Sequence, residues 1–252
     1  MARPVTLITG ASAGLGAEFA RQCAARGDEL VLVARRRDRL DSLAAELGGR
    51  AHVIAADLAM PEAGAALLRE VERLGLDIAT LINNAGFGLT GRIAELPLDR
   101  QLEMIDLNIR LLTELTRRVL PAMRERRAGA ILNVASTAAF QAGPGMGVYF
   151  ATKAYVLSFT EALHHELKGS GIKVTALCPG PVATEFGEVA GVTSKSFYRL
   201  AGTPPAVVVS GLRALDRGQV IVVPGFQNKL GAQAHRLLPR AALRRIIAAV
   251  KF

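Results

Sequence analysis

The chain has 252 residues, half of them apolar, which is ample for one α/β domain with a substantial core. Its net charge of +9 would suit a nucleic-acid-binding protein, but six basic residues and no acid lie beyond residue 225, so the rest is nearly balanced and no nucleic-acid partner is expected. The two isolated cysteines, Cys23 and Cys178, and the four histidines, of which His164 and His165 are adjacent, lack metal-type spacing. We therefore expect a reduced, cytoplasmic protein without a catalytic metal.

Short apolar strands alternate with longer helices along the chain, the pattern of a doubly wound parallel sheet with helices on both faces. Seven strands are expected, at Val5–Thr9, Glu29–Ala34, Ala51–Ala56, Ile78–Asn83, Gly129–Ala135, Ile172–Cys178 and Val220–Val223. No repeat or linker divides the sequence, so residues 1–252 are predicted to form a single domain. Ligands of such sheets bind beyond the carboxyl ends of the strands.

The first expected strand runs directly into glycines. Gly10, Gly14 and Gly16 predict a tight turn that opens a helix, and Ser12 and Leu15 lie in the same turn. Glycine lets the backbone approach a pyrophosphate, and the helix N-terminus presents free N–H groups and the positive end of its dipole. The spacing differs from Gly-x-Gly-x-x-Gly, but the position after a first strand favours dinucleotide binding.

The second expected strand ends in Arg35, Arg36 and Arg37, where a dinucleotide-binding fold presents the group that contacts the adenosine ribose. An acid there would accept from the 2′-hydroxyl, whereas arginine suits a 2′-phosphate. No acid stands there, so the sequence predicts NADP(H) rather than NAD(H). Alternatively, the three arginines form a solvated loop before the next helix, since Asp38 and Asp41 follow.

Tyr149 and Lys153 are one helical turn apart, and Ser136 lies upstream of them. Residues four apart share one helix face, so a phenol, an ammonium and a hydroxyl can converge on one reacting oxygen. At about 5 Å and an effective dielectric of about 20, the lysine would lower the tyrosine pKa from about 10 to about 8. That value suits general acid–base catalysis near neutral pH.

Together these motifs resemble the short-chain dehydrogenase/reductase family, in its form of about 250 residues. The motifs that carry the resemblance are Thr9-Gly-x-x-x-Gly-x-Gly16, Asp57-Leu58, Asn83-Asn84-Ala85-Gly86, Asn108, Ser136, Tyr149-x-x-x-Lys153, and Pro179-Gly180 followed by Thr184. The resemblance implies a Rossmann fold and an oxidoreductase that interconverts a ketone or aldehyde and an alcohol by hydride transfer. A non-catalytic NADPH-binding sensor or scaffold is the alternative.

The resemblance also implies a role for each catalytic residue. Tyr149 would act as general acid or base, and Ser136 would orient the reacting oxygen. Lys153 would lower the Tyr149 pKa and hold the nicotinamide ribose. Asn108 would complete a tetrad by supporting a water that relays protons to Lys153.

Cofactor contacts follow from the same resemblance. Asp57 would hold the adenine amino group, Asn84-Ala85-Gly86 would pass beside the adenosine ribose, and Thr184 would reach the nicotinamide amide. The expected cofactor-binding residues are Gly10, Ser12, Gly14, Leu15, Gly16, Arg35, Arg36, Asp57, Leu58, Asn84, Ala85, Gly86, Tyr149, Lys153, Pro179, Gly180, Val182 and Thr184.

Residues 181–205 are expected to form a lid over the substrate cleft, as in the family. This segment contributes six apolar or aromatic side chains: Phe186, Val189, Val192, Phe197, Tyr198 and Leu200. Phe140 and Met146 add two more near Ser136. They predict a mostly apolar substrate, although such residues can also pack against the body of the protein.

The tail, residues 225–252, is basic and carries Leu243, Ile246, Ile247 and Val250 at helical spacing. It could make peripheral contact with an anionic membrane, which would suit a lipid reductase acting on a ketoacyl or steroid-like substrate. It could instead fold over the substrate cleft. Packing on the surface of its own or a partner's chain is the simplest interpretation.

Two expected helices, Leu98–Arg126 and the helix of Tyr149, have apolar residues on two sides. In the first, Leu102 and Ile105 belong to one stripe and Met104 to another. A helix that is apolar on two sides is usually buried on both. A thick core would explain this, but in the family these helices form the dimer contact, so a homodimer or homotetramer is expected.

Overall fold

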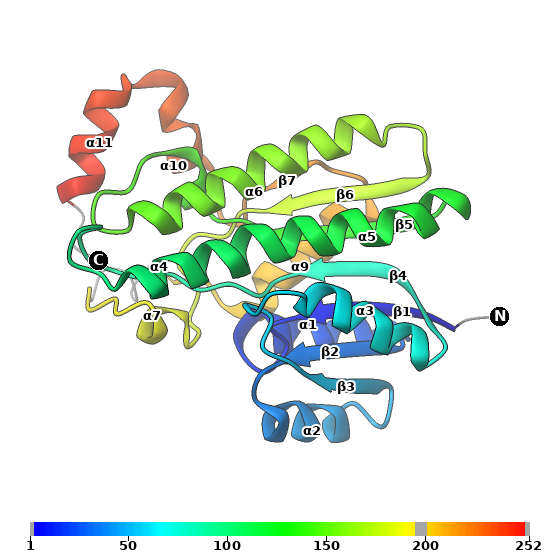
Figure 1. Cartoon of the computed structure of the whole chain (residues 1–252). Helices are drawn as coiled ribbons and strands as arrows, with labels where there is room; N and C mark the ends of the chain where they lie inside the picture. Colours follow the sequence, from blue (N-terminus) through cyan, green and yellow to red (C-terminus); the bar gives the residue numbers. More distant parts are fainter. Residues whose placement is uncertain (1–2, 195–200, 250–252) are drawn as a thin grey trace.

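The computed structural model describes residues 3–194 and 201–249. Its centre is a parallel sheet of seven strands in the order β3-β2-β1-β4-β5-β6-β7 (Figure 1). The strands are β1 (Arg3–Thr9), β2 (Leu30–Ala34), β3 (Ala51–Ala55), β4 (Leu76–Asn83), β5 (Gly129–Val134), β6 (Ile172–Leu177) and β7 (Ile221–Val222). All seven predicted strands are present, and the doubly wound fold is confirmed. The strand order reverses between β1 and β4, where such sheets bind ligands.

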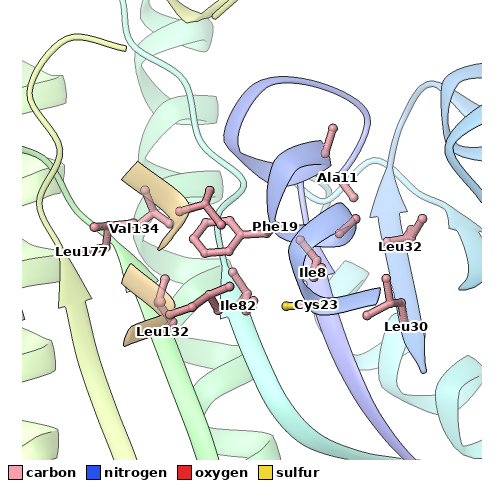
Figure 2. Close-up of a cluster of buried hydrophobic side chains, with 14 of the residues drawn as sticks. Ile8, Ala11, Phe19, Cys23, Leu30, Leu32, Ile82, Leu132, Val134 and Leu177 are labelled. Carbon is pink, nitrogen blue, oxygen red and sulfur yellow. The ribbon is translucent and has the colours of Figure 1, made fainter. Parts of the chain in front are cut away.

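Helices cover both faces of the sheet. One face carries α1 (Gly14–Ala25), α2 (Arg37–Glu46) and α9 (Pro204–Asp216), and the other carries α3 (Ala63–Arg73), α5 (Leu112–Glu125) and α6 (Gly147–Glu166). Because successive strand residues point to opposite faces, Ile8 joins the first layer and Leu7 the second. Phe19 of α1 lies at the centre of the first cluster, against Ile82, Leu132 and Val134 (Figure 2).

The helix predicted over Leu98–Arg126 is not a continuous α-helix. It consists of α4 (Leu98–Ile105), a π-helical segment η1 (Asp106–Leu111) and α5. A π turn inserts an extra residue and redirects the side chains around it, which the sequence periodicity did not reveal. Of the two predicted stripes, the one with Met104 is buried, whereas Leu102 and Ile105 are exposed.

The C-terminal part returns to the carboxyl edge of the sheet. A short helix α7 (Phe186–Val189) lies in the segment predicted as a lid. After β7, α10 (Phe226–Leu237) and α11 (Arg240–Ala249) form an arm beside the beginning of α6 (Figure 1). None of the described helices is long and apolar enough to span a bilayer.

Candidate active site

The glycine-rich turn after β1 leaves no room for a side chain at its glycine positions. Gly10 and Gly14 have positive φ angles of 67° and 56°, which favour glycine. A Cβ on Gly16 would lie 2.1 Å from the carbonyl oxygen of Gly10. The turn leads into the N-terminus of α1, whose first turn contains no acid. A pyrophosphate group can approach this backbone closely, and the positive end of the α1 dipole attracts its negative charge.

Thr9 and Asn84 hold this turn in place. The Thr9 hydroxyl oxygen accepts hydrogen bonds from the backbone N–H groups of Asn84 and Ala85, each at 3.0 Å. The Asn84 side-chain amide donates to the carbonyls of Thr9 and Gly10, at 2.9 and 3.2 Å. The loops after β1 and β4 are thereby fixed to each other. Sequence reasoning assigned no such role to Thr9, because the bonds join residues that are distant in the chain.

Arg36, rather than Arg35, reaches the glycine-rich turn. The Arg36 Nε and Nη2 atoms lie 3.3 and 3.2 Å from the Ser12 hydroxyl oxygen. Arg36 also pairs with Glu185 at 2.8 Å, and Arg39 pairs with the same carboxylate. These two guanidinium groups lower the pKa of Glu185, with Arg39 the larger cause. Arg35 is mostly exposed and its nearest acid is Glu103, at 3.7 Å.

The end of β3 lies at the same edge of the sheet. Leu58 is buried and Asp57 is exposed, with the Asp57 Oδ1 atom accepting from the backbone N–H of Ala59 at 3.1 Å. This turn leaves the second carboxylate oxygen of Asp57 available to a ligand. Its predicted contact with the adenine amino group stays a prediction.

A cavity of about 290 Å³ lies at the carboxyl ends of the central strands. Ten of the predicted site residues line it: Leu15, Asn84, Gly86, Ser136, Tyr149, Lys153, Pro179, Gly180, Val182 and Thr184. Met146, Phe150 and Phe186 add apolar walls, and Ile247 reaches the cavity from α11. The contact of Ile247 agrees with the tail folding over the cleft.

Tyr149, Ser136 and Lys153 come together in this cavity. Tyr149 and Lys153 lie on the first turns of α6, and the Ser136 hydroxyl lies close enough to the Tyr149 phenol to lower its pKa. The Ser136 oxygen also accepts from the backbone N–H of Ala138 at 3.1 Å. Lys153 Nζ donates to the Val134 carbonyl at 2.8 Å and lies 5.8 Å from the centre of the Tyr149 ring.

Burial controls the protonation of this pair. It raises the pKa of Tyr149 to about 12, against a smaller lowering by the nearby Ser136 hydroxyl. It also lowers the pKa of Lys153 to about 8. The predicted Tyr149 pKa near 8 is therefore wrong for the protein alone. The sequence estimate counted the attraction of the lysine charge and omitted the cost of burying a phenolate.

Asn108 lies behind the cavity wall, buried in the π-helical segment. Its side-chain amide donates to the Phe87 carbonyl and to the Thr152 hydroxyl, both at 3.0 Å, and its carbonyl oxygen accepts from the Phe87 N–H at 3.2 Å. Gly86 passes so close that a Cβ there would lie 2.8 Å from the Asn108 carbonyl oxygen. Asn108 thus fixes the loop after β4, and its predicted support of a water stays a prediction.

The two cysteines are buried, and their thiols are not activated as nucleophiles. Burial raises the pKa of both Cys23 and Cys178 to about 12, so both thiols stay protonated. Within residues 3–194 and 201–249, no group of three His, Cys, Asp or Glu side chains could hold a metal ion.

The predicted lid residues divide into three groups. Phe186 lines the cavity and Val192 is buried. Val189 is 54% exposed and does not line the cavity, so its contribution to the cleft stays a prediction. Phe197, Tyr198 and Leu200 lie outside the described residues.

Three similar proteins cover most of the chain. A sulfoacetaldehyde reductase of Chromohalobacter salexigens is 40% identical over 186 residues, covering 72% of this chain and 74% of that protein. An NADP-dependent 3-hydroxy acid dehydrogenase of Escherichia coli is 33% identical over 246 residues, covering 92% and 99%. A solved structure of a Sphingobium yanoikuyae short-chain dehydrogenase in complex with NADPH is 35% identical, with a TM-score of 0.83, and covers 98% of this chain and 96% of that one.

Residues 4–193 match the sequence model of the short chain dehydrogenases. The match contains the glycine-rich turn, Asn108, Ser136, Tyr149, Lys153 and Thr184. It agrees with the fold, with a turn shaped for a dinucleotide and with the phenol, hydroxyl and ammonium in one cavity. The chain belongs to the short-chain dehydrogenase/reductase family of oxidoreductases, which use a nicotinamide cofactor.

Proposed function

We propose that the protein reduces a ketone or aldehyde to an alcohol with NADPH, reversibly, with Tyr149 as the general acid. The observation that carries the proposal is the state of the Tyr149 phenol. Burial keeps it protonated, it lies beside the Ser136 hydroxyl, and it lines a cavity that continues to Leu15 and Thr184 on the cofactor side. A neutral phenol aimed at a carbonyl oxygen is a proton donor for reduction.

In this mechanism the bound cofactor supplies the hydride that forms the new C–H bond. Tyr149 donates its proton to the carbonyl oxygen, so the substrate gains one hydride and one proton. The Ser136 hydroxyl donates a hydrogen bond to the same oxygen and stabilises the charge that develops there. Lys153, buried beside the phenol, stabilises the resulting phenolate by its charge. In the oxidation direction the Tyr149 phenolate accepts the proton of the alcohol.

The preference for NADP(H) is assigned to Ser12, Arg36 and Arg39. A hydroxyl and two guanidinium groups beside the glycine-rich turn suit a 2′-phosphate, which arginine binds through two parallel hydrogen bonds. The proposal is supported by the NADPH complex of one relative and the NADP dependence of another. The Glu185 carboxylate already pairs with Arg36 and Arg39, so a bound 2′-phosphate would compete with Glu185 for these two arginines.

The substrate is expected to be mostly apolar where it meets the catalytic residues. Met146, Phe150, Phe186 and Ile247 line the cavity around Tyr149. The printed names of the relatives differ in substrate, a sulfonated aldehyde in one and a 3-hydroxy acid in the other, so they select neither for this chain.

A panel of ketones, aldehydes and alcohols, assayed with NADPH/NADP and with NADH/NAD, tests the proposal. We expect NADPH oxidation with at least one apolar carbonyl compound and a lower kcat/KM with NADH. A protein that binds NADPH but reduces no member of the panel would support the sensor or scaffold alternative.

A homodimer or homotetramer is proposed through α4 and α6. Leu98, Leu102 and Ile105 of α4 and Tyr155 of α6 are large apolar side chains that are exposed in the single chain. Their burial against a second copy would remove a contiguous apolar surface from water. Light scattering coupled to size exclusion checks this, and a monomeric mass would contradict it.

A further inference from the structure

A second cavity adjoins the catalytic one. It has a volume of about 300 Å³ and is lined by Phe140, Gln141, Ala142, Arg240, Leu243 and Arg244. Gln141 lines both cavities, so the two lie on either side of one residue. A molecule that enters the catalytic cavity past Gln141 would therefore meet the two arginines.

One face of α11 spans both cavities. Arg240, Arg244 and Ile247 follow one another at intervals of four and three residues, which places them on one side of the helix. The arginines face the second cavity, and Ile247 faces the first. Leu243 on the same side is buried, which anchors the helix against the body. The arm with α11 lies beside the beginning of α6, which carries Tyr149 (Figure 1).

The two cavities differ in charge. Of the described residues that line the catalytic cavity, Lys153 alone is charged, and its ammonium donates to the Val134 carbonyl. The second cavity has two guanidinium groups, which make no ion pair with any residue in 3–194 or 201–249. Residues 225–249 contain no acid. An uncharged part of a ligand therefore fits the catalytic cavity, and an anionic group of the same ligand fits the second cavity.

From this arrangement we propose that the substrate is an elongated carbonyl compound with an apolar body and an anionic group, such as a carboxylate or phosphate, at the end remote from the carbonyl. Arg240 and Arg244 bind that group, and Gln141 lies beside the chain between the two ends. This inference rests on the proposed function, because it takes the carbonyl to be bound at Tyr149. It makes Arg240 and Arg244 specificity-determining residues.

The test compares methyl ketones of increasing length that end in a carboxylate with their uncharged methyl esters. Wild-type protein should prefer the acid of a particular length, with a preference that shrinks as salt is added, because exposed charge pairs are screened. The double variant Arg240→Gln/Arg244→Gln should lose about tenfold in kcat/KM for that acid and keep its kcat/KM for the ester. Arg245→Gln is the matched control, since Arg245 is exposed and lies on neither cavity.

Calorimetry with saturated carboxylates of the same lengths, which have no ketone group to reduce, provides a readout that does not depend on turnover. Binding that weakens in the double variant and persists in Arg245→Gln supports the anion site even if no ketone is reduced. Equal kcat/KM for acids and esters at every length, together with equal binding by all three proteins, would overturn the proposal. Salt-sensitive binding to anionic vesicles with no preference among the ketones would overturn it in favour of a membrane surface.

Discussion

The glycine-rich turn and the C-terminal arm lie at the same edge of the sheet but are held in opposite ways. Side-chain to backbone hydrogen bonds from Thr9 and Asn84 fix the turn, and Gly16 packs against the Gly10 carbonyl. In the arm, Phe226 and Leu230 of α10 are 81% and 64% exposed. The first region leaves its backbone almost no freedom, whereas the second is attached by few buried side chains.

This contrast parallels the extent of the family sequence model. The model matches residues 4–193, which include the turn and the catalytic residues, and its match ends before the arm begins at Phe226, although individual relatives align over 92% and 98% of the chain. A cofactor common to many enzymes demands one fixed geometry. Substrates differ between enzymes, so an element that contributes Ile247 to the cleft can vary without disturbing hydride transfer.

The largest difference between the glycine-rich turn and the C-terminal arm is expected for a glycine-to-alanine substitution in each. Gly16→Ala places a Cβ against the Gly10 carbonyl, so we expect a loss of about 1–3 kcal/mol in the free energy of unfolding and about 100-fold in NADPH affinity. A Cβ at Gly231 in α10 would meet nothing within 4 Å. Gly231→Ala should leave NADPH affinity unchanged. Because alanine has a higher helix propensity than glycine, the substitution should raise the free energy of unfolding by up to about 1 kcal/mol.

Urea unfolding and fluorescence titration with NADPH measure both effects. Equal behaviour of the two variants would show that the turn is no more constrained than the arm.

Within the cofactor region, Arg36 and Arg35 should differ. Arg36→Gln removes the guanidinium beside Ser12 and should weaken NADPH binding about 10-fold while leaving NADH nearly unaffected. Arg35→Gln, which removes a mostly exposed side chain, should have a smaller effect. Glu185→Gln should tighten NADPH binding by freeing the two arginines. Dissociation constants for both cofactors check this, and an equal loss of NADH affinity in Arg36→Gln would contradict it.

The catalytic pair should give different pH profiles in the two directions. Because burial raises the pKa of Tyr149 to about 12, the phenol stays protonated through neutral pH. The kcat/KM for reduction should therefore stay nearly constant between about pH 6 and 8. Oxidation needs the phenolate, so its kcat/KM should rise about tenfold per pH unit until it reaches the pKa set in the cofactor complex. A reduction rate that rises with pH would contradict the role of Tyr149 as an acid.

The smallest expected effect concerns stability. Burial lowers the pKa of Lys153 from 10.5 to about 8, so the folded state disfavours the charged lysine. The penalty is complete below about pH 8 and disappears above about pH 10.5. It amounts to roughly 3 kcal/mol, offset by about 1 kcal/mol for the hydrogen bond to Val134.

Lys153→Met should therefore be inactive yet more stable than the parent by about 2 kcal/mol at pH 7, with the difference shrinking toward pH 10. Urea unfolding at both pH values measures this, with exposed Lys168→Met as the control. A destabilised Lys153→Met at pH 7 would show that the buried ammonium contributes favourably to folding.

The sequence predicted the strands well because each is a short apolar run beside a turn or helix signal. The same local signals located Gly10, Ser136, Tyr149 and Lys153, which follow a strand or share a helix face. The π-helical turn at Asn108 was missed because its extra residue depends on packing rather than on periodicity.

Contacts between distant segments were also missed. The pairing of Glu185 with Arg36 and Arg39 joins residues far apart in the chain. The contact of Ile247 with the cleft also joins distant residues, and for that reason the sequence left folding of the tail over the cleft as one of three interpretations. The predicted Tyr149 pKa was wrong for a related reason. The spacing between Tyr149 and Lys153 is visible in the sequence, but the burial that raises the pKa depends on the whole fold.

Single-turnover reduction by Tyr149→Phe, measured together with NADPH affinity, tests the proposed chemistry most directly. The substitution removes one hydroxyl and keeps the ring that packs against Phe150 and Phe186. We expect the rate to fall at least about 1,000-fold while the NADPH dissociation constant stays within about twofold of the parent value. A rate near that of the parent, with NADPH bound normally, would contradict the assignment of Tyr149 as the proton donor.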